Sequence, residues 1–440
     1  MAMVVKNNMQ ALNTLNTLNS NTNALTSSLK KVSSGMKINS AQDDASGYAI
    51  SERMRVQIRS LDQAKANTNS GNSLLKVAEG AVSSTVEILK TLKEKVINAA
   101  NDTNTDEDRA TIQKELNQSI DQINDNASVT FNGKFLVDGT HNKKTTATTT
   151  ALTNQSLSAT TTSATGLTDL ANRNGDSLNI QSTDTVTISY TKNGVTYTCS
   201  MQVSNNSLSS IINSATQNDG TTKFSADFSF SNGTSLIGVD GSGNSVYTAS
   251  GESALTIAAG ASGIGGQIAG LSISITDNQG NARKAANSAL DAFSESIRAV
   301  NESGDNSIHL QIGTKANQTI NVGMTDMRAV ALGLQGDDGT VLNVGTREKA
   351  NAAITVLDNA IQKALDQQTS IGAAESRLDY TASNLTTASE NVTNAESTIR
   401  DADMAKEMTE YTKNNVLMQA AQSMLAQANQ NSSNVLSLLQ

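Results

Sequence analysis

The chain has 440 residues, with 32 Lys and Arg against 41 Asp and Glu, and its net charge of −9 argues against a basic nucleic-acid surface. It contains no proline and no tryptophan, which favours long uninterrupted helices with aliphatic contacts over a large globular enzyme interior. Its single cysteine, Cys199, excludes an internal disulfide framework.

The N-terminal residues do not have the pattern of a targeting segment. They lack the continuous apolar stretch and the cleavage site of a secretory signal. No run of 18 apolar residues occurs, so no membrane span is predicted. We therefore expect either a cytoplasmic protein or one exported by a route that needs no cleaved signal.

The first predicted helix ends near Ser34. Gly35 is placed to terminate it, because glycine adopts the left-handed conformation without strain. In the polar segment that follows, Ser40 or Asp43 is expected to cap the next helix. The apolar residues of the first helix recur every three or four positions, as in a helix that packs against another: Leu15, Leu18, Leu25, Leu29 and Val32.

Two long seams of apolar or small residues follow, from Leu61 to Ala99 and from Ile354 to Ile399. A seam this long has to bury against another helix, because an isolated helix in water gains too little from propensity alone. We predict that the two segments pack together, which folds the chain back on itself. Between them, Thr105 and the acidic residues after it predict the start of another helix.

Residues 141–306 have a different pattern, which predicts an inserted β-rich domain. An alternating run from Val186 to Val203 is interrupted by Asn193-Gly194, a dipeptide typical of tight hairpins. The stretch from Thr145 to Thr165 shows no periodicity and is a candidate for O-glycosylation. Further predicted elements are a hairpin around 228–233, a strand at 271–275 and a helix near 283–300.

The C-terminal part begins with a predicted hairpin at 309–322, followed by a helix that Thr346 is expected to cap. The last arm carries apolar residues on two lines, among them Met418 and Leu425, a wider face than one partner helix covers. The chain end is apolar and uncapped, so a partner is expected to cover Leu436, Leu438 and Leu439.

No catalytic, metal or cofactor site is predicted. The two histidines, His141 and His309, belong to no metal-binding motif, and nucleophile-elbow and Walker A sequences are absent. The pair Asp43-Asp44 lacks the ligand spacing of a calcium loop. Capping and interfacial hydrogen bonding are the interpretation we adopt for this pair.

Three motifs resemble the terminal signatures of the bacterial flagellins. The first is the run from Lys31 to Gly47, which includes Ser33-Ser34-Gly35 and Ala41-Gln42-Asp43-Asp44. The others are Phe131-Asn132-Gly133 and Leu425-Ala426-Gln427-Ala428-Asn429-Gln430, the latter followed by Val435 to Leu439. The resemblance covers roughly 1–140 and 307–440.

This resemblance implies a mainly α fold: an antiparallel coiled coil or helical bundle built from both chain ends, with an inserted β-rich outer domain. Residues 1–43 with 397–440 would form inner terminal coiled-coil arms, 44–140 with 307–396 a helical rod domain with a β-hairpin, and 141–306 a solvent-facing variable domain. Interface residues are expected at Leu15, Leu18, Leu25, Leu29, Val32, Ser34, Gly35, Asn39, Asp43, Asp44, Met418, Leu425, Leu436, Leu438 and Leu439.

The implied function is that of a structural subunit that polymerises into the extracellular flagellar filament for motility. The implied partners are other copies of the chain, an export chaperone on the C-terminal arm, and the filament cap and hook-junction proteins, with secretion through the flagellar type III apparatus. A hook–filament junction protein and a filament subunit with an adhesin-like outer domain stay open as alternatives.

The resemblance also concerns host recognition. Flagellins sensed by the flagellin-specific Toll-like receptor usually carry an Arg and a Leu on the helix that includes residues 89–96 here. The matching positions are Thr91 and Lys95, while the acidic partner is retained as Glu115. Losing a bidentate guanidinium and placing an ammonium at an apolar contact each cost affinity, so weak signalling is implied.

Overall fold

The computed structural model describes residues 8–204, 206–216, 223–231 and 235–438. The chain divides into two compact units. The first comprises Met1–Thr68, Gln311–Gln318 and Tyr380–Gln440, and the second comprises Asn69–Leu310 and Thr319–Asp379. The long helices α2 (Ala45–Ala99) and α6 (Arg347–Arg400) contribute residues to both.

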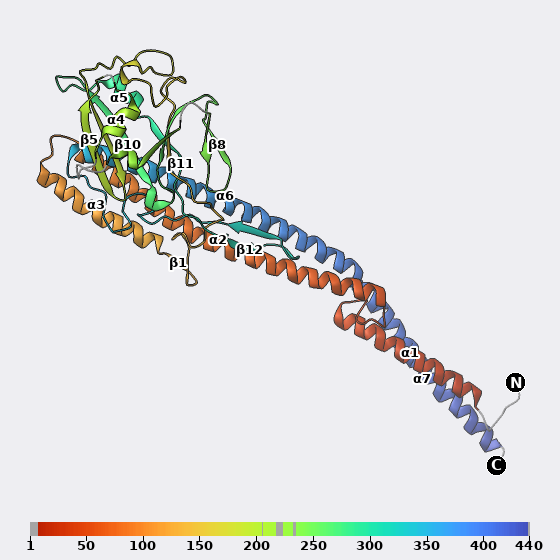
Figure 1. Cartoon of the computed structure of the whole chain (residues 1–440). Coiled ribbons are helices and arrows are strands. Elements are labelled where there is room, and N and C mark those ends of the chain that lie inside the picture. The colour runs from red at the N-terminus through yellow and green to blue at the C-terminus, as the bar shows by residue number, and fades with distance from the viewer. Residues whose placement is uncertain (1–7, 205, 217–222, 232–234, 439–440) are drawn as a thin grey trace. The chain divides into compact units, whose positions relative to one another are not determined.

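In the first unit, α1 (Met9–Ser34) and α7 (Met404–Leu438) lie side by side (Figure 1). The Asn8 side chain caps the start of α1 by accepting a hydrogen bond from the Ala11 amide at 3.0 Å. Gly35 ends the helix at φ 75°, and its amide donates to the Lys31 carbonyl. The predicted end of the first helix is therefore confirmed.

The cap of α2 is neither of the two predicted residues. Asp44, and not Ser40 or Asp43, accepts hydrogen bonds from the Ser46 and Gly47 amides, both at 3.0 Å. Asp43 instead closes the preceding turn, because its Oδ2 accepts from the amides of Asn39 and Ser40. Each aspartate thus satisfies a different set of backbone donors.

Both predicted seams are covered in the structure. Every seam position of α2 from Leu61 to Ala99 is buried, and none of the α6 positions from Ile354 to Ile399 is exposed. Within the second unit, the Asn72 amide donates to Asp379 Oδ1 at 2.8 Å across the two helices. A pattern of small and apolar residues is therefore sufficient to select the buried face here.

Helix α3 (Asp106–Ala127) begins as predicted at Thr105, which forms a capping box with Asp108. Its Asn126 donates to Ser84 of α2 at 3.1 Å. A two-residue hairpin follows, β1 (Thr130–Phe131) and β2 (Lys134–Phe135), and the hairpin β12 (Ile308–Gln311) with β13 (Thr319–Val322) confirms the prediction at 309–322.

The β-rich part of the second unit contains two larger antiparallel sheets. One has the order β10-β4-β5, with β4 (Thr185–Lys192), β5 (Val195–Gln202) and β10 (Ile268–Thr276). The other has the order β11-β3-β9-β6, with β3 (Ala151–Asn154), β6 (Phe228–Ser231), β9 (Leu255–Ala259) and β11 (Phe293–Ile297). A separate hairpin pairs β7 (Leu236–Val239) with β8 (Ser245–Tyr247).

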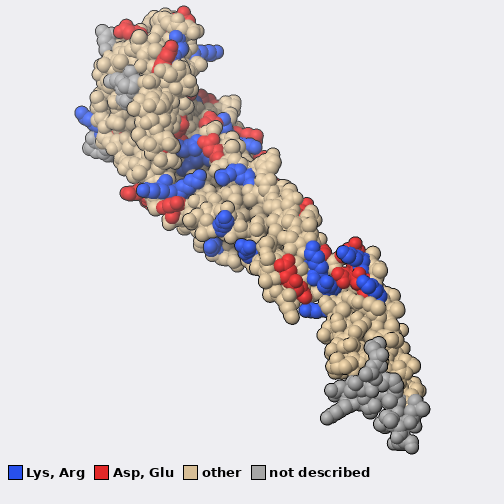
Figure 2. Space-filling view, turned by 90° about the vertical axis from the view of Figure 1, so that its right-hand side faces the viewer, with Lys and Arg blue, Asp and Glu red and all other residues tan. Residues whose placement is uncertain are grey.

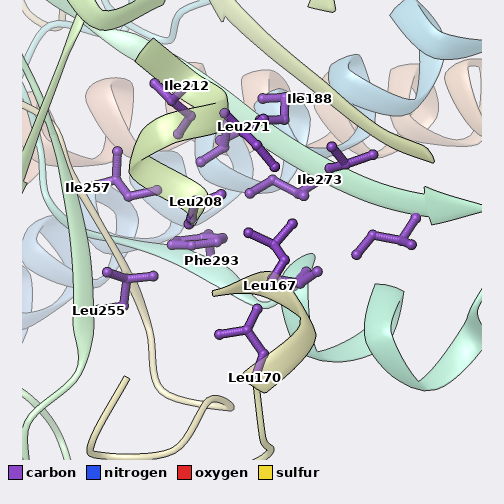
Figure 3. Close-up of a cluster of buried hydrophobic side chains, with 14 of the residues drawn as sticks. Leu167, Leu170, Ile188, Leu208, Ile212, Leu255, Ile257, Leu271, Ile273 and Phe293 are labelled. Atoms are coloured by element: carbon purple, nitrogen blue, oxygen red, sulfur yellow. The ribbon is translucent and has the colours of Figure 1, made fainter. Parts of the chain in front are cut away.

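One apolar core joins the two sheets with helices α4 (Leu208–Ser214) and α5 (Lys284–Leu290) (Figure 3). Tyr190 of β4 is fully buried, with its ring centroid 4.8 Å from those of Phe224 and Phe228. Its hydroxyl donates to Asp227 Oδ2 at 2.6 Å, so the buried phenol has a polar partner.

Three predictions for this domain were wrong in part. The stretch from Thr145 to Thr165 is not irregular throughout, because it contains β3, where Thr153 and Asn154 are fully buried. The hairpin predicted around 228–233 does not form between β6 and β7, since β6 pairs with β9; Asn232 and Gly233 lie outside the described residues. The helix predicted near 283–300 ends at Leu290, and β11 follows.

Candidate assembly surfaces

The seam between α1 and α7 combines small and polar residues with larger apolar ones. The covered positions of α1 recur every three or four residues and include three of the five predicted apolar positions: Ala11, Thr14, Leu18, Asn21, Leu25, Ser28 and Val32. Facing them on α7 are Glu407, Tyr411, Asn414, Met418, Ala421, Leu425 and Ala428. Small residues allow close approach, but they bury little apolar area per helical turn.

Polar contacts set the antiparallel register of this pair. The Asn8 amide donates to the Ala428 carbonyl and the Asn21 amide to the Leu417 carbonyl, both at 3.2 Å. At the other end, Lys31 forms an ion pair with Glu407 at 3.5 Å. These bonds are specific to one alignment of the helices, whereas apolar contacts tolerate several.

Many large apolar side chains of the two helices lie outside this seam. Each of the following is at least 41% exposed: Met9, Leu12, Leu15 and Leu29 on α1, and Met404, Met408, Val416, Leu417 and Met424 on α7. Exposed apolar residues in this number on one helix pair are typical of an interaction surface.

The predicted interface residues of the arms therefore separate into two groups. Leu18, Leu25 and Val32, with Met418 and Leu425, are partly covered within the pair. Leu15 and Leu29 are exposed. Leu436 and Leu438 belong to the backbone of α7, but their side chains, and Leu439 altogether, lie outside the described residues.

The connection between α1 and α2 holds the remaining predicted residues: Ser34, Gly35, Asn39, Asp43 and Asp44. The Asn39 amide donates to the Met36 carbonyl at 3.1 Å. Hydrogen bonds from the backbone of Asn39 and then of Ser40 hold the pKa of the Asp43 carboxyl below its usual value. These residues order a short turn, and no arrangement among them resembles a catalytic site.

Sequence reasoning missed Arg400, which links the end of α6 to the first turns of α2. Its guanidinium is buried and forms an ion pair with Glu52 Oε1 at 2.6 Å. That hydrogen bond lowers the pKa of Glu52. Arg400 also lies over the Tyr48 ring, 5.5 Å from its centroid. A lone arginine at a helix end carries no pattern that would have indicated this role.

The predicted receptor-facing patch lies on α2 and α3 in the second unit. Thr91 is exposed. Lys95 Nζ lies 3.1 Å from Glu115 Oε1, and both side chains are at least 40% exposed. The structure thus brings Lys95 and Glu115 together, so that the retained acidic residue is already paired with a cation of its own chain.

The described residues contain no group of three His, Cys, Asp or Glu side chains that could hold a metal ion. No described helix is long and apolar enough to cross a membrane. On the face shown in Figure 2, Lys and Arg side chains are interspersed with Asp and Glu. That distribution does not resemble the single-sign surface of a nucleic-acid-binding protein.

The family models and the curated relatives identify one family. The model of the bacterial flagellin N-terminal helical region matches residues 5–142, and that of the C-terminal helical region matches 354–439. The chain is 35% identical over 429 residues to a flagellin of Clostridium tyrobutyricum, covering 97% of this chain and 99% of that protein. It is 31% identical over 458 residues to a flagellin of Bacillus subtilis strain 168, covering 99% and 100%.

Proposed function

The chain belongs to the bacterial flagellins and is a structural subunit of the flagellar filament, and on this premise we propose that it polymerises through the outward faces of α1 and α7. It is not an enzyme. The filament is extracellular and serves motility. The observation that carries the proposal is the number of large apolar side chains that α1 and α7 leave exposed outside their mutual seam.

The energetics favour contacts between copies. Fully burying a leucine side chain contributes about 1.5–3 kcal/mol. Within one chain much of that contribution is absent, because the side chains of Leu12, Leu15 and Leu29 are exposed. Association of further copies would bury these faces, and this burial would offset the entropic cost of ordering the helices. We extend the proposal to the interface residues of the connecting turn, whose fixed backbone would present Asn39 and Asp43 to a neighbour.

Substitution of Leu15 and Leu29 by Gln tests this proposal. Losing about 1.5 kcal/mol at one contact corresponds to a roughly tenfold higher equilibrium concentration of monomer. We expect at least this increase in the concentration of monomer that stays in solution when seeded filaments are sedimented. Leu236→Gln is the matched control, because Leu236 on β7 is 42% exposed against 41% for Leu15. Equal polymerisation of the double variant and the control would contradict the proposal.

We propose the following division of the chain. Residues 1–43 with 397–440 form the inner arms, 44–140 with 307–396 the rod, and 141–306 the solvent-facing domain. An export chaperone would cover the C-terminal arm before assembly, where Met404, Met408 and Met424 supply adaptable apolar contacts. The same arms would also contact the filament cap and the hook-junction proteins. Export would proceed through the flagellar type III apparatus.

Weak signalling through the flagellin-specific Toll-like receptor is also proposed. The Lys95–Glu115 ion pair supports it, because a receptor cation would have to compete with Lys95 for the carboxylate. We expect the variant carrying Thr91→Arg and Lys95→Leu to be the more potent agonist in a reporter-cell assay, with Lys90→Leu as the control on the same helix. Full potency of the unmodified chain would exclude the proposal.

The two alternative functions are not favoured. A hook–filament junction protein is disfavoured because the relatives that match over nearly the whole chain are flagellins. An adhesin-like outer domain has no observation of its own to support it. O-glycosylation between Thr145 and Thr165 is restricted by the fold, since Thr148, Thr150, Thr153 and Thr161 are buried.

A further inference from the structure

A cavity of about 830 Å³ lies between β11 and α6 in the second unit. Residues 293–298 form one wall and residues of α6 from Ile354 to Asp366 form the other. Its apolar lining includes Phe293, Ile297 and Val300. Neither wall belongs to the arms that carry the proposed assembly surface.

The charged groups of this cavity are mostly acidic. Arg298 is the one cation among the described lining residues, and it is already shared between two carboxylates: its Nη2 lies 2.6 Å from Asp366 Oδ2 and its Nε 3.4 Å from Glu295 Oε2. The charge of Arg298 is therefore already compensated, which disfavours an anionic ligand. Five carboxylates line the same space, of which Asp358 is paired with Lys93 and Asp366 with Arg298: Asp240, Asp291, Glu295, Asp358 and Asp366.

Glu295 is the group that points to a ligand. Its side chain is 5% exposed, and its Oε1 is buried without a hydrogen-bond partner among the described residues. Burial raises the pKa of this carboxyl, although the charges of Arg298 and Lys363 oppose the effect. A buried carboxylate oxygen without a donor costs free energy, and an ammonium group from outside would supply both the charge and the hydrogen bond.

We propose that this cavity binds an aliphatic polyamine, with one ammonium group on Glu295 Oε1 and the methylene chain against Phe293, Ile297 and Val300. The carboxylates are distributed along the walls, and no three among the described residues converge on a metal position. A single compact cation therefore does not match the site. Several separated positive charges joined by apolar linkers match both the acidic and the apolar parts of the lining.

The test is calorimetric titration of spermidine into the purified full-length chain before polymerisation, at low ionic strength. We expect one site, with at least tenfold weaker binding by Glu295→Gln. Glu94→Gln, on the exposed face of α2, removes the same charge elsewhere and is expected to bind as the unmodified chain does. Mg²⁺ at matched ionic strength is expected to compete poorly with spermidine. General attraction to the net charge of −9 would not distinguish the two cations, so poor competition indicates a specific site.

Asp366→Asn keeps the test decisive if Glu295→Gln fails to fold, as judged by circular dichroism. This change removes a lining charge and leaves Arg298 less compensated, so spermidine should again bind at least tenfold more weakly. Equal affinity for a folded Glu295→Gln or Asp366→Asn variant and the unmodified chain overturns the proposal. Full displacement by Mg²⁺ also overturns it. Neither result bears on polymerisation.

Discussion

Two glycines of α2 have opposite steric surroundings. A Cβ at Gly47 would lie 2.4 Å from Asp44 Oδ2 and 2.7 Å from Ile38 Cδ1. Asp44 cannot easily move, because its Oδ1 caps the helix, and Ile38 is buried. A Cβ at Gly80 would meet nothing within 4 Å. Replacing glycine by alanine should therefore change the stability in opposite directions at the two positions.

We predict that Gly47→Ala destabilises the filament by about 1–3 kcal/mol, the usual cost of overpacking a tight contact. Gly80→Ala should instead stabilise it by about 0.5–1 kcal/mol, because alanine favours the helix interior. Thermal dissociation of filaments of each variant measures both effects. A Gly47→Ala filament that dissociates at the temperature of the Gly80→Ala filament would refute the steric argument.

At the scale of elements, α2 and α6 carry an unfavourable acidic contact. Burial raises the pKa of Glu375 on α6, and the neighbouring charges of Glu79 and Asp379 raise it further, while Lys76 opposes them. At neutral pH the folded state must therefore keep this carboxylate ionised at a cost. That cost disappears as the pH falls through the raised folded pKa towards the value of the unfolded chain.

Glu375→Gln is accordingly predicted to raise the thermal midpoint of the monomer at pH 7.5, with the difference shrinking as the pH approaches 4. Unfolding followed by circular dichroism at both pH values checks the sign. Glu94→Gln on α2 serves as the comparison, since Glu94 is exposed. A larger stabilisation at pH 4 than at pH 7.5 would contradict the electrostatic explanation.

At the scale of the whole molecule, ordering of the arms and assembly are expected to occur together. The α1·α7 seam contains Thr14, Asn21 and Ser28 at covered positions, so one chain by itself gains little from closing it. The remaining apolar area lies outside the seam and is exposed in the single chain, where the proposed contacts with other copies would bury it. Marginal helices in the free chain are the physical consequence.

We therefore predict a gain in helicity when purified monomer polymerises, visible as a deeper far-UV circular dichroism signal at constant protein concentration. A chain lacking residues 1–43 and 397–440 is the control, and its signal should not change under the same conditions. An unchanged signal for the full chain during filament growth would show that the arms are already ordered.

Much of the fold followed from local patterns. The seams of α2 and α6, the end of α1 at Gly35 and the hairpin turn at Asn193-Gly194 each depend on residues close in sequence, through periodicity, capping or a left-handed backbone. The family motifs also lie in such segments. The local sequence therefore determines where these helices and turns form.

Only the tertiary structure decided the remainder. β3 has no periodicity, and its hydrogen-bond partners β9 and β11 lie about a hundred residues or more along the chain. Which line of α1 faces α7 was also undetermined, because Leu15 and Leu29 satisfy a heptad as well as Ala11 and Ser28 do. Arg400 and Glu295 acquire their surroundings from distant segments. Local periodicity selects a helix and its stripes, but burial of a particular stripe depends on partners that the local sequence does not specify.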